Sequence, residues 1–262
     1  MIIGTLPRFG DNNDESNPWR YSVAGSFGTG REIAAEYGFE LITLFPPNCE
    51  EACRMCDGLL LPGSTQGILS TYWGEEDTFV RDFIYDEYAH DRIAIEHFVK
   101  AGKPIFGVCG GLQELNIYFG GSIKHAVFSE SILDHRDEDE KHEIEIVEGS
   151  MLYDAFGTTS ARVNSMHGWV IDRLAPALTV SGINKKDGLI EAVENREMGI
   201  FATQWHPEQV YNSMEWVIEK YTDPREKKLF ENFLALCEER KQKSASKKER
   251  AMALSFYIQI TP

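Results

Sequence analysis

One junction in the sequence, between an apolar run and a helical pattern, constrains the fold more than any other feature. The run Ile105–Val108 is short and apolar, as expected of a strand buried on both faces of a parallel sheet, and a helical pattern follows it. Gly107 and Gly111 flank Cys109 at the turn, and their missing Cβ atoms allow neighbouring chain to approach closely. The segment predicts a strand, a tight turn and a helix, with Cys109 at the turn.

Cys109 is a candidate nucleophile because of this position. A nucleophile on a sharp strand-to-helix turn is held in a strained backbone conformation. The free N–H groups and positive dipole end of the following helix favour the thiolate. The N–H of Gly110 is placed to stabilise an oxyanion. The alternative is a buried strand end with an inert cysteine, but the strand before it and the helix after it favour the nucleophile.

The rest of the chain alternates strand and helix patterns. Apolar runs at 41–45 and 58–61 resemble that at 105–108, and helical patterns occupy 30–37 and 85–100. Residues 142–147 alternate polar and apolar, and 199–205 is a further strand. Segments 178–183 and 189–193 flank Asp187-Gly188, a pair that predicts a hairpin turn. The predicted fold is α/β, with a mostly parallel central sheet, flanking helices and a small antiparallel section.

We expect one domain over residues 1–240 and a C-terminal tail over 241–262. Residues 226–240 follow helical spacing with an apolar face made by Leu229, Phe230, Phe233, Leu234 and Cys237. Residues 241–248 are polar and basic, a composition typical of a flexible segment. The apolar end, 251–260, fits either docking on the domain or disorder, so the order of the tail is left open.

Composition excludes some partners. The chain has 262 residues, 42 acidic against 26 basic, and a formal net charge of −16, which argues against nucleic acid. We see no signal peptide and no apolar run long enough to span a membrane. Five cysteines in a chain of this length indicate free thiols in a reducing compartment, so we expect a cytoplasmic protein without membrane partners.

A cysteine nucleophile needs a base, usually a histidine oriented by a third group. His206 is the best candidate because it follows the predicted strand 199–205, and Pro207 ends further pairing. Glu208 can reach the far ring nitrogen of His206. His167 is the second candidate, or a residue of the substrate pocket. His125, His135 and His142 are interpreted as surface or loop residues.

Two further patterns were weighed against plainer explanations. Cys49, Cys53 and Cys56 have a spacing used by some iron–sulfur sites, but one helix face turned to the core explains it more simply. The glycines between 25 and 30 lack the Gly-Lys-Ser/Thr ending of a phosphate loop, so no nucleotide site is predicted.

The motifs together resemble a known family. Gly107 to Gln113 around Cys109, with His206-Pro207-Glu208, is similar to the class I glutamine amidotransferase superfamily, which has a flavodoxin-like fold. Segments 61–64, 72–75, 113–116 and 163–167 narrow the resemblance to the γ-glutamyl-γ-aminobutyrate hydrolase branch, the peptidase C26 group. The resemblance covers about residues 1 to 238.

This resemblance implies a hydrolase domain over residues 1–240 that cuts a γ-glutamyl amide bond through a cysteine thioester, as in putrescine degradation. It implies a catalytic triad of Cys109, His206 and Glu208, with no metal and no cofactor. Oxyanion and substrate contacts would come from Gly63, Ser64, Gly110, Gln113, Ser165 and His167. The partner is a small γ-glutamyl substrate, and a homodimer is left open. The alternatives are a glutaminase subunit that supplies ammonia to a separate synthetase, and a non-catalytic binding protein.

Substrate identity is the least determined property. Many members of the branch carry Arg after the cysteine, where this chain has Gly110, so one charged contact is lost. Acidic residues crowd the flanking segments 75–77 and 134–140. They fit a solvated acidic surface best; the alternative is a negative rim that attracts a γ-glutamyl polyamine.

Overall fold

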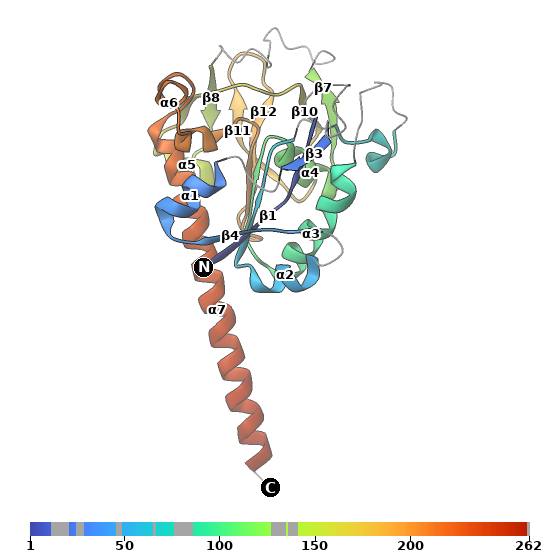
Figure 1. Cartoon of the computed structure of the whole chain (residues 1–262), viewed down its shortest axis with the longest axis vertical. Coiled ribbons are helices and arrows are strands. Elements are labelled where there is room, and N and C mark those ends of the chain that lie inside the picture. Colours follow the sequence, from blue (N-terminus) through green and yellow to red (C-terminus); the bar gives the residue numbers. More distant parts are fainter. Residues whose placement is uncertain are drawn as a thin grey trace.

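The centre of the molecule is a nine-stranded sheet with the strand order β4-β1-β5-β6-β13-β12-β11-β8-β9 (Figure 1). The computed structural model describes residues 1–11, 21–24, 29–45, 49–64, 67–75, 86–126, 135 and 141–260. Helices cover both faces of the sheet, so the α/β fold class is confirmed. Two small antiparallel pairs lie outside it: β10 (Trp169–Arg173) with β7 (Ser122–His125), and β2 (Arg8–Asp11) with β3 (Tyr21–Ala24).

The first five strands of that order are parallel. They are β4 (Glu40–Thr43), β1 (Ile2–Thr5), β5 (Gly58–Leu61), β6 (Ile105–Val108) and β13 (Ile200–Thr203). Because they run the same way, their carboxyl ends lie at one edge of the sheet. The residues that follow β1, β5, β6 and β13 therefore meet at that edge.

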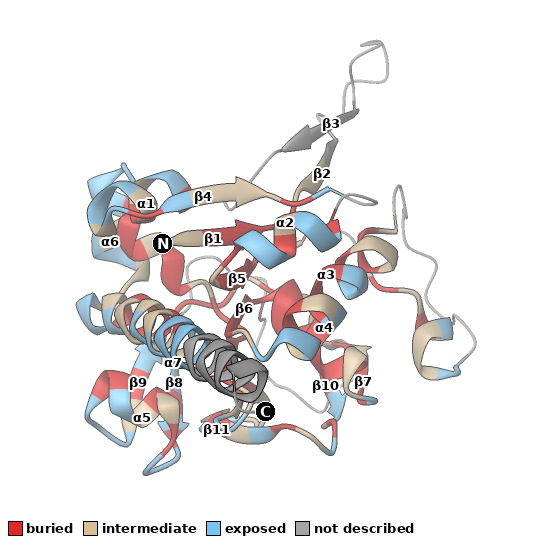
Figure 2. Ribbon diagram, turned by 90° about the horizontal axis from the view of Figure 1, so that it is seen from below, coloured by how far each residue is buried: buried red, intermediate tan, exposed pale blue. Residues whose placement is uncertain are grey.

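Alternate side chains of these strands face two cores. Leu60 and Phe106 pack with α1 (Gly30–Tyr37) and the start of α7 (Lys227–Ile260). Leu59 and Ile105 face α2 (Cys49–Met55), α3 (Glu87–Ala101) and α4 (Gly110–Tyr118). Figure 2 shows these two groups of helices on opposite sides of the buried strands. The period of two in a strand explains the division.

The antiparallel section is larger than the sequence indicated. β12 (Ile190–Asn195), β11 (Thr179–Asn184), β8 (His142–Ile146) and β9 (Ser160–Val163) continue the sheet through four antiparallel pairings. The predicted hairpin is β11–β12, with Gly188 at φ 72° in its loop. The sequence analysis did not identify β9, because a four-residue strand carries little periodicity. Helix α5 (Met151–Phe156) lies between β8 and β9 in the chain.

Four short elements complete the described chain: η1 (Ser70–Trp73), η3 (Pro207–Tyr211), α6 (Glu215–Tyr221) and η4 (Pro224–Glu226). Within the described ranges, no helix combines the length and apolarity needed to cross a membrane. The acidic segment 76–77, residues 134 and 136–140, and most of the glycine-rich stretch 25–30 lie outside the described residues.

Helix α7 differs from the expected end of the domain. Its predicted apolar face is confirmed, since Leu229, Phe230, Phe233 and Cys237 are buried. The flexible segment expected from residue 241 is instead a continuation of the helix to Ile260. Lys, Gln, Ala and Arg are good helix formers, and Gln242 and Lys243 each bond a glutamate four residues earlier. The domain boundary at residue 240 stays a prediction.

The three closely spaced cysteines are core residues, as the simpler explanation predicted. Cys49, Cys53 and Cys56 are buried among apolar side chains of the core under α2 and α3. The sulfur atoms of Cys49 and Cys53 lie 3.3 Å apart.

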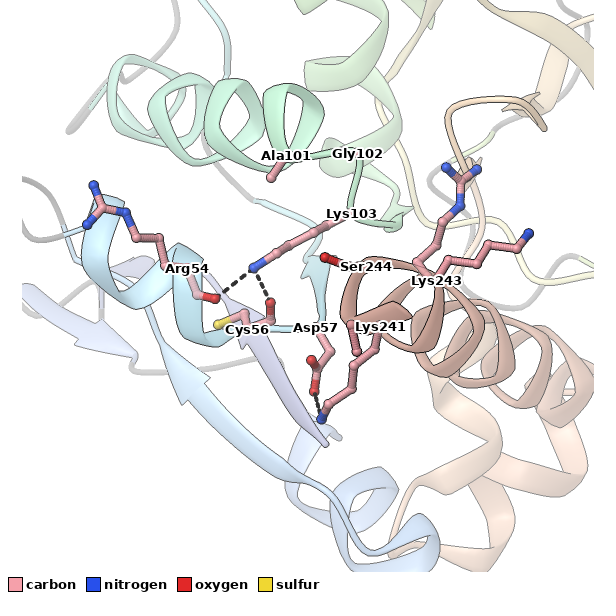
Figure 3. A pocket seen from close by; sticks show the side chains of 11 residues that line it. Arg54, Cys56, Asp57, Ala101, Gly102, Lys103, Lys241, Lys243 and Ser244 are labelled. Atoms are coloured by element: carbon pink, nitrogen blue, oxygen red, sulfur yellow. Dashed lines mark hydrogen bonds and ion pairs between the residues drawn. The ribbon is translucent and has the colours of Figure 1, made fainter. Parts of the chain in front are cut away.

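A basic cavity of about 510 Å³ lies at the amino-terminal edge of the sheet, between α7 and the segments before β5 and β6 (Figure 3). Two lysines that line it bind carbonyl and carboxylate groups of the protein itself. Lys103 donates to the carbonyl oxygens of Cys53 and Arg54 at 2.6 and 2.9 Å, and Lys241 pairs with Asp57 at 3.0 Å. The Lys241–Asp57 pair fastens α7 to the body of the molecule, and Lys103 joins the segment before β6 to α2, at the edge opposite Cys109.

Candidate active site

The turn at Cys109 has the strained geometry that the sequence predicted. Cys109 has φ 50° and ψ −103°, and it is the one non-glycine residue with positive φ in the described part of the chain. Its N–H donates to the carbonyl of Thr203 at 2.7 Å, which joins the turn to β13. A Cβ at Gly111 would lie 2.4 Å from the carbonyl oxygen of Leu61, so glycine is required there. The side chain of Cys109 thus lies at the carboxyl edge, at the start of α4.

His206 and Glu208 meet Cys109 at this edge. His206 follows β13, and its Nδ1 lies 2.6 Å from Oε1 of Glu208. Burial works against protonation of His206, but the carboxylate of Glu208 and the Cys109 sulfur together raise the pKa of His206 well above its ordinary value. A Cβ on Gly63 would lie 2.9 Å from Cε1 of His206 and 3.4 Å from Cβ of Cys109. The thiol, the imidazole and the loop after β5 are therefore immediate neighbours.

Asn164 fixes the backbone of His206, a contact that the sequence analysis missed. The side-chain oxygen of Asn164 accepts from the N–H of His206 at 2.9 Å, and its amide nitrogen donates to the carbonyl of His206 at 2.9 Å. Asn164 is fully buried at the end of β9. The segment 163–167 was part of the family resemblance, but nothing in the sequence indicated that Asn164 would contact His206.

The loop after β5 lies directly against the first turn of α4. A Cβ added to Gly110 would be 2.9 Å from the nitrogen of Ser64 and 3.2 Å from its Cβ. The backbone N–H groups near Gly63 and Ser64 are therefore close to that of Gly110. This tight approach gives a reason for glycine at position 110, since a side chain there would displace the loop.

Arg8 supports the same loop from behind, and no sequence motif pointed to it. Its Nε donates to the carbonyl of Gly63 at 2.7 Å, and its Nη2 donates to that of Pro62 at 2.6 Å. The guanidinium pairs with Asp91 at 2.6 Å and lies 3.8 Å from Glu87, which also accepts from the hydroxyl of Ser64. The loop is thus held by charge-assisted hydrogen bonds.

Comparisons with known proteins identify the family of the chain. A family model described as Peptidase C26 matches residues 41–208. The glutamine amidotransferase-like protein YvdE of Lactococcus lactis is 31% identical over 245 residues, which cover 88% of this chain and 97% of that protein. The chain belongs to the peptidase C26 family.

One curated enzyme and one solved structure are also similar to this C26 chain. The gamma-glutamyl-gamma-aminobutyrate hydrolase PuuD of Escherichia coli is 31% identical over 211 residues, or 74% of this chain and 76% of that enzyme. A glutamine amidotransferase from Thermotoga maritima shares the fold, with a TM-score of 0.56 and 18% identity over 92% of this chain and 85% of that one. As a member of the C26 family, the chain is a hydrolase.

In this C26 hydrolase, Gln113 lies in α4, four residues after Cys109. Its side-chain nitrogen donates to the carbonyl of Trp169 at 3.2 Å and to the side-chain oxygen of Gln204 at 3.4 Å. Gln204 in turn places its Nε2 3.7 Å from the sulfur of Cys109. Gln204 was not identified from sequence, although it stands two residues before His206. The predicted role of Gln113 in holding substrate stays a prediction.

Ser165 and His167 lie in a separate buried polar cluster. Its members are His135, His142, Ser165, His167, Asp187 and Glu191. His125, His135 and His142 were interpreted as surface or loop residues; all three are buried, so a surface position is wrong, although His135 does lie in a turn. Polar residues in short strands and loops gave no signal of burial, because their partners are distant in sequence. The predicted place of Ser165 and His167 in the pocket wall stays a prediction.

Proposed function

We propose that this C26 hydrolase cleaves γ-glutamyl amide bonds, with γ-glutamyl-γ-aminobutyrate or a related γ-glutamyl amine as substrate. The observation that carries the proposal is the strained turn at Cys109, which faces His206, itself 2.6 Å from Glu208. Nucleophile, base and orienting group are the parts that covalent acyl transfer requires. The name of the relative PuuD supports the substrate class.

In the first half of the reaction, the Cys109 thiolate attacks the γ-carbonyl carbon. The raised pKa of His206 favours an imidazolium beside that thiolate. Negative charge that develops on the carbonyl oxygen is stabilised by the N–H groups of Gly110 and of Gly63 or Ser64, at about 3 kcal/mol per donor. His206 gives its proton to the leaving nitrogen, and the amine departs.

In the second half, the γ-glutamyl thioester is hydrolysed. His206 is now neutral and takes a proton from water, which attacks the thioester carbonyl. The carbon–sulfur bond breaks, glutamate leaves, and the thiolate–imidazolium pair is restored. Glu208 orients the imidazole and stabilises its cationic form throughout. Arg8 holds the loop that carries the oxyanion donors through the carbonyl groups of Pro62 and Gly63.

The test is replacement of Cys109 by alanine. We expect Cys109→Ala to abolish release of glutamate from γ-glutamyl amides, because no other group forms the thioester. Cys56→Ala is the matched control, since Cys56 is also buried but lies in the core away from His206. Substantial turnover by Cys109→Ala, measured with a panel of γ-glutamyl amides, would refute the proposal.

Chemical labelling provides a second readout. Burial raises the pKa of Cys56 to about 12 and that of Cys237 above its ordinary value, so these thiols are poor nucleophiles at neutral pH. A glutamine-like electrophile should therefore label Cys109 in preference to them, as mapped by peptide mass spectrometry. Equal labelling of the core cysteines would contradict an activated Cys109.

The second candidate is a glutaminase subunit that supplies ammonia to a separate synthetase. The likeness to glutamine amidotransferases in sequence and in fold favours it. Hydrolysis of glutamine and of γ-glutamyl amines by the isolated chain separates the two. A stand-alone hydrolase prefers the amines without a partner, whereas a glutaminase subunit acts on glutamine and responds to its synthetase.

A further inference from the structure

The buried polar cluster beside the active site has the arrangement of a metal site. It gathers at the carboxyl edge from three parts of the sheet: His142 at the start of β8, His167 beyond the end of β9, and Glu191 at the start of β12. His135 lies between β7 and β8 in the chain. All four side chains are buried, and Glu191 is fully enclosed. These segments are far apart in the chain, so the fold alone brings them together.

Donor atoms of His135, His142 and Glu191 lie at distances that one ion can bridge, and Nε2 of His167 lies near Glu191 but outside that group of three. Nε2 of His142 is 3.1 Å, Nε2 of His167 is 3.7 Å and Nδ1 of His135 is 3.9 Å from Oε1 of Glu191. Ligand atoms of His135, His142 and Glu191 all lie within 4.8 Å of one another. Ligands at roughly 2.0–2.1 Å around a tetrahedral Zn²⁺ are about 3.3 Å apart, so small shifts of His135, His142 and Glu191 would form three of the four bonds, and a larger movement of His167 would add the fourth.

The donor atoms are not satisfied by one another, and Nδ1 of His135 contacts the hydroxyl of Ser165 at 3.1 Å. Nε2 of His142, Nε2 of His167 and both carboxylate oxygens of Glu191 are buried without a hydrogen-bond partner. His142 and Glu191 are close enough for a hydrogen bond, but they are not aligned for one. A buried carboxylate without partners is costly. Two ligand atoms that both point at one metal ion are expected to lie close together without being aligned for a hydrogen bond with each other.

Neighbouring groups hold two of the histidines from behind. Nδ1 of His167 lies 3.2 Å from the carbonyl of Trp169, which can only accept, so Nδ1 is the donor in that hydrogen bond. Nε2 of His135 lies 2.8 Å from the carboxylate of Asp187. A carboxylate or carbonyl behind a histidine is the usual support of a metal ligand.

We propose that His135, His142, His167 and Glu191 form a buried site for a divalent transition-metal ion, with Zn²⁺ the best fit. Three imidazoles and one carboxylate suit Zn²⁺ in tetrahedral geometry, and they are too few and too nitrogen-rich for Ca²⁺ or Mg²⁺. Four protein ligands leave no open position, so the site is structural. This departs from the sequence-based expectation of no metal.

Such an ion would stabilise the wall of the active site. It would tie together the starts of β8 and β12 and the end of β9. The carbonyl of Glu191 accepts from the N–H of Gln204 at 2.7 Å, and the side chain of Gln204 contacts the sulfur of Cys109. The metal site would therefore fix Gln204, which contacts Cys109, without itself contacting the reacting atoms.

The test is metal content of the untagged protein by plasma mass spectrometry, followed by removal with a chelator and titration with Zn²⁺ and Co²⁺. We expect about one Zn²⁺ per chain, a melting temperature that falls on removal and recovers with Zn²⁺, and the visible bands of tetrahedral Co²⁺. A protein that holds no metal as purified and binds neither ion would overturn the proposal.

Variants locate the ion. Glu191→Gln and His142→Gln should lose it, and Asp187→Asn should weaken its binding by roughly 10- to 100-fold. His97→Gln, a histidine outside the cluster, should keep it. Cys109→Ala should also keep it; loss of metal there would mean that the ion sits on Cys109 and His206 and would refute the site. If the cluster variants fail to fold, X-ray absorption at the zinc edge of the wild-type protein decides, because sulfur in the first shell excludes these four ligands.

Discussion

At the scale of single residues, the candidate site depends on close packing around the side chains of Cys109, His206 and Glu208. Gly63 and Gly110 let the loop after β5 approach His206 and α4, and Asn164 holds the backbone of His206 from both sides. These residues supply no charge to the reaction. They set the positions of the groups that do, and a misplacement of about 1 Å can cost roughly 100-fold in rate.

Asn164→Ala should weaken both catalysis and stability. It removes two hydrogen bonds to the backbone of His206 and leaves a buried N–H without a partner, at about 1–3 kcal/mol of unfolding free energy. We expect kcat to fall by roughly 10- to 100-fold. Steady-state assays and urea unfolding measure the two effects, and unchanged kcat in the folded variant would contradict this role.

Gly110→Ala should slow the reaction by moving the loop. Its Cβ would lie 2.9 Å from the nitrogen of Ser64, so either the loop or α4 must shift. We expect kcat/KM to fall by about tenfold or more, equivalent to ~1.4 kcal/mol of transition-state stabilisation. Gly110→Arg should be at least as slow. A rate equal to wild type would show that the loop adjusts without loss.

At the scale of elements, α7 has a packed part and an exposed part. Its buried side chains, as far as they are described, lie between Leu229 and Cys237. From Lys241 to Ser246 the side chains are exposed, and the helix leaves the body of the molecule (Figure 1). The contact of Lys241 with Asp57 marks the end of its attachment on the side shown in Figure 3.

Truncation should separate these two parts. Removal of residues 247–262 should leave activity unchanged and the unfolding free energy within about 0.5 kcal/mol, as for surface changes in general. Removal from residue 227 onward should prevent folding, because it deletes the buried Phe230 and Phe233. Thermal melts and activity assays of both truncated proteins are the check. A large loss of stability in the shorter deletion would mean that the end of α7 packs on the protein.

At the scale of the whole molecule, a buried charge network joins three elements. Arg8 follows β1, Asp91 is on α3 and Glu114 is on α4. Burial, and then the carboxylate of Asp91, raise the pKa of Glu114 well above its ordinary value. Glu114 is therefore protonated in the folded protein at a pH where it is ionised in the unfolded chain.

This network predicts a pH dependence of stability. The stability that protonated Glu114 contributes is complete below its unfolded pKa of about 4.3, and it is lost as pH rises through its raised folded pKa. One proton gives a slope of at most about 1.4 kcal/mol per pH unit. Glu114→Gln keeps the shape without the titration, so its unfolding free energy should decline less from pH 5 to 8. Parallel curves of unfolding free energy against pH for the wild type and Glu114→Gln would contradict the prediction.

The sequence by itself determined the parts that are local. The apolar run at 105–108, the glycines around Cys109 and the helix after it are contiguous, so the strand, the turn and the position of Cys109 follow from spacing alone. His206 and Glu208 are two residues apart and could be paired in the same way. The parallel strands and the apolar face of α7 could also be predicted from the sequence, because hydrophobic periodicity reports burial directly.

Only the tertiary structure decided which distant polar groups meet. Arg8 reaches the loop after β5, Asn164 reaches His206, and three histidines surround Glu191, although nothing in their local sequence marks them. A charged or polar residue in isolation looks like surface. It becomes part of a site when strands that are distant in sequence end at one edge of a sheet, and that is a property of topology, which no local pattern encodes.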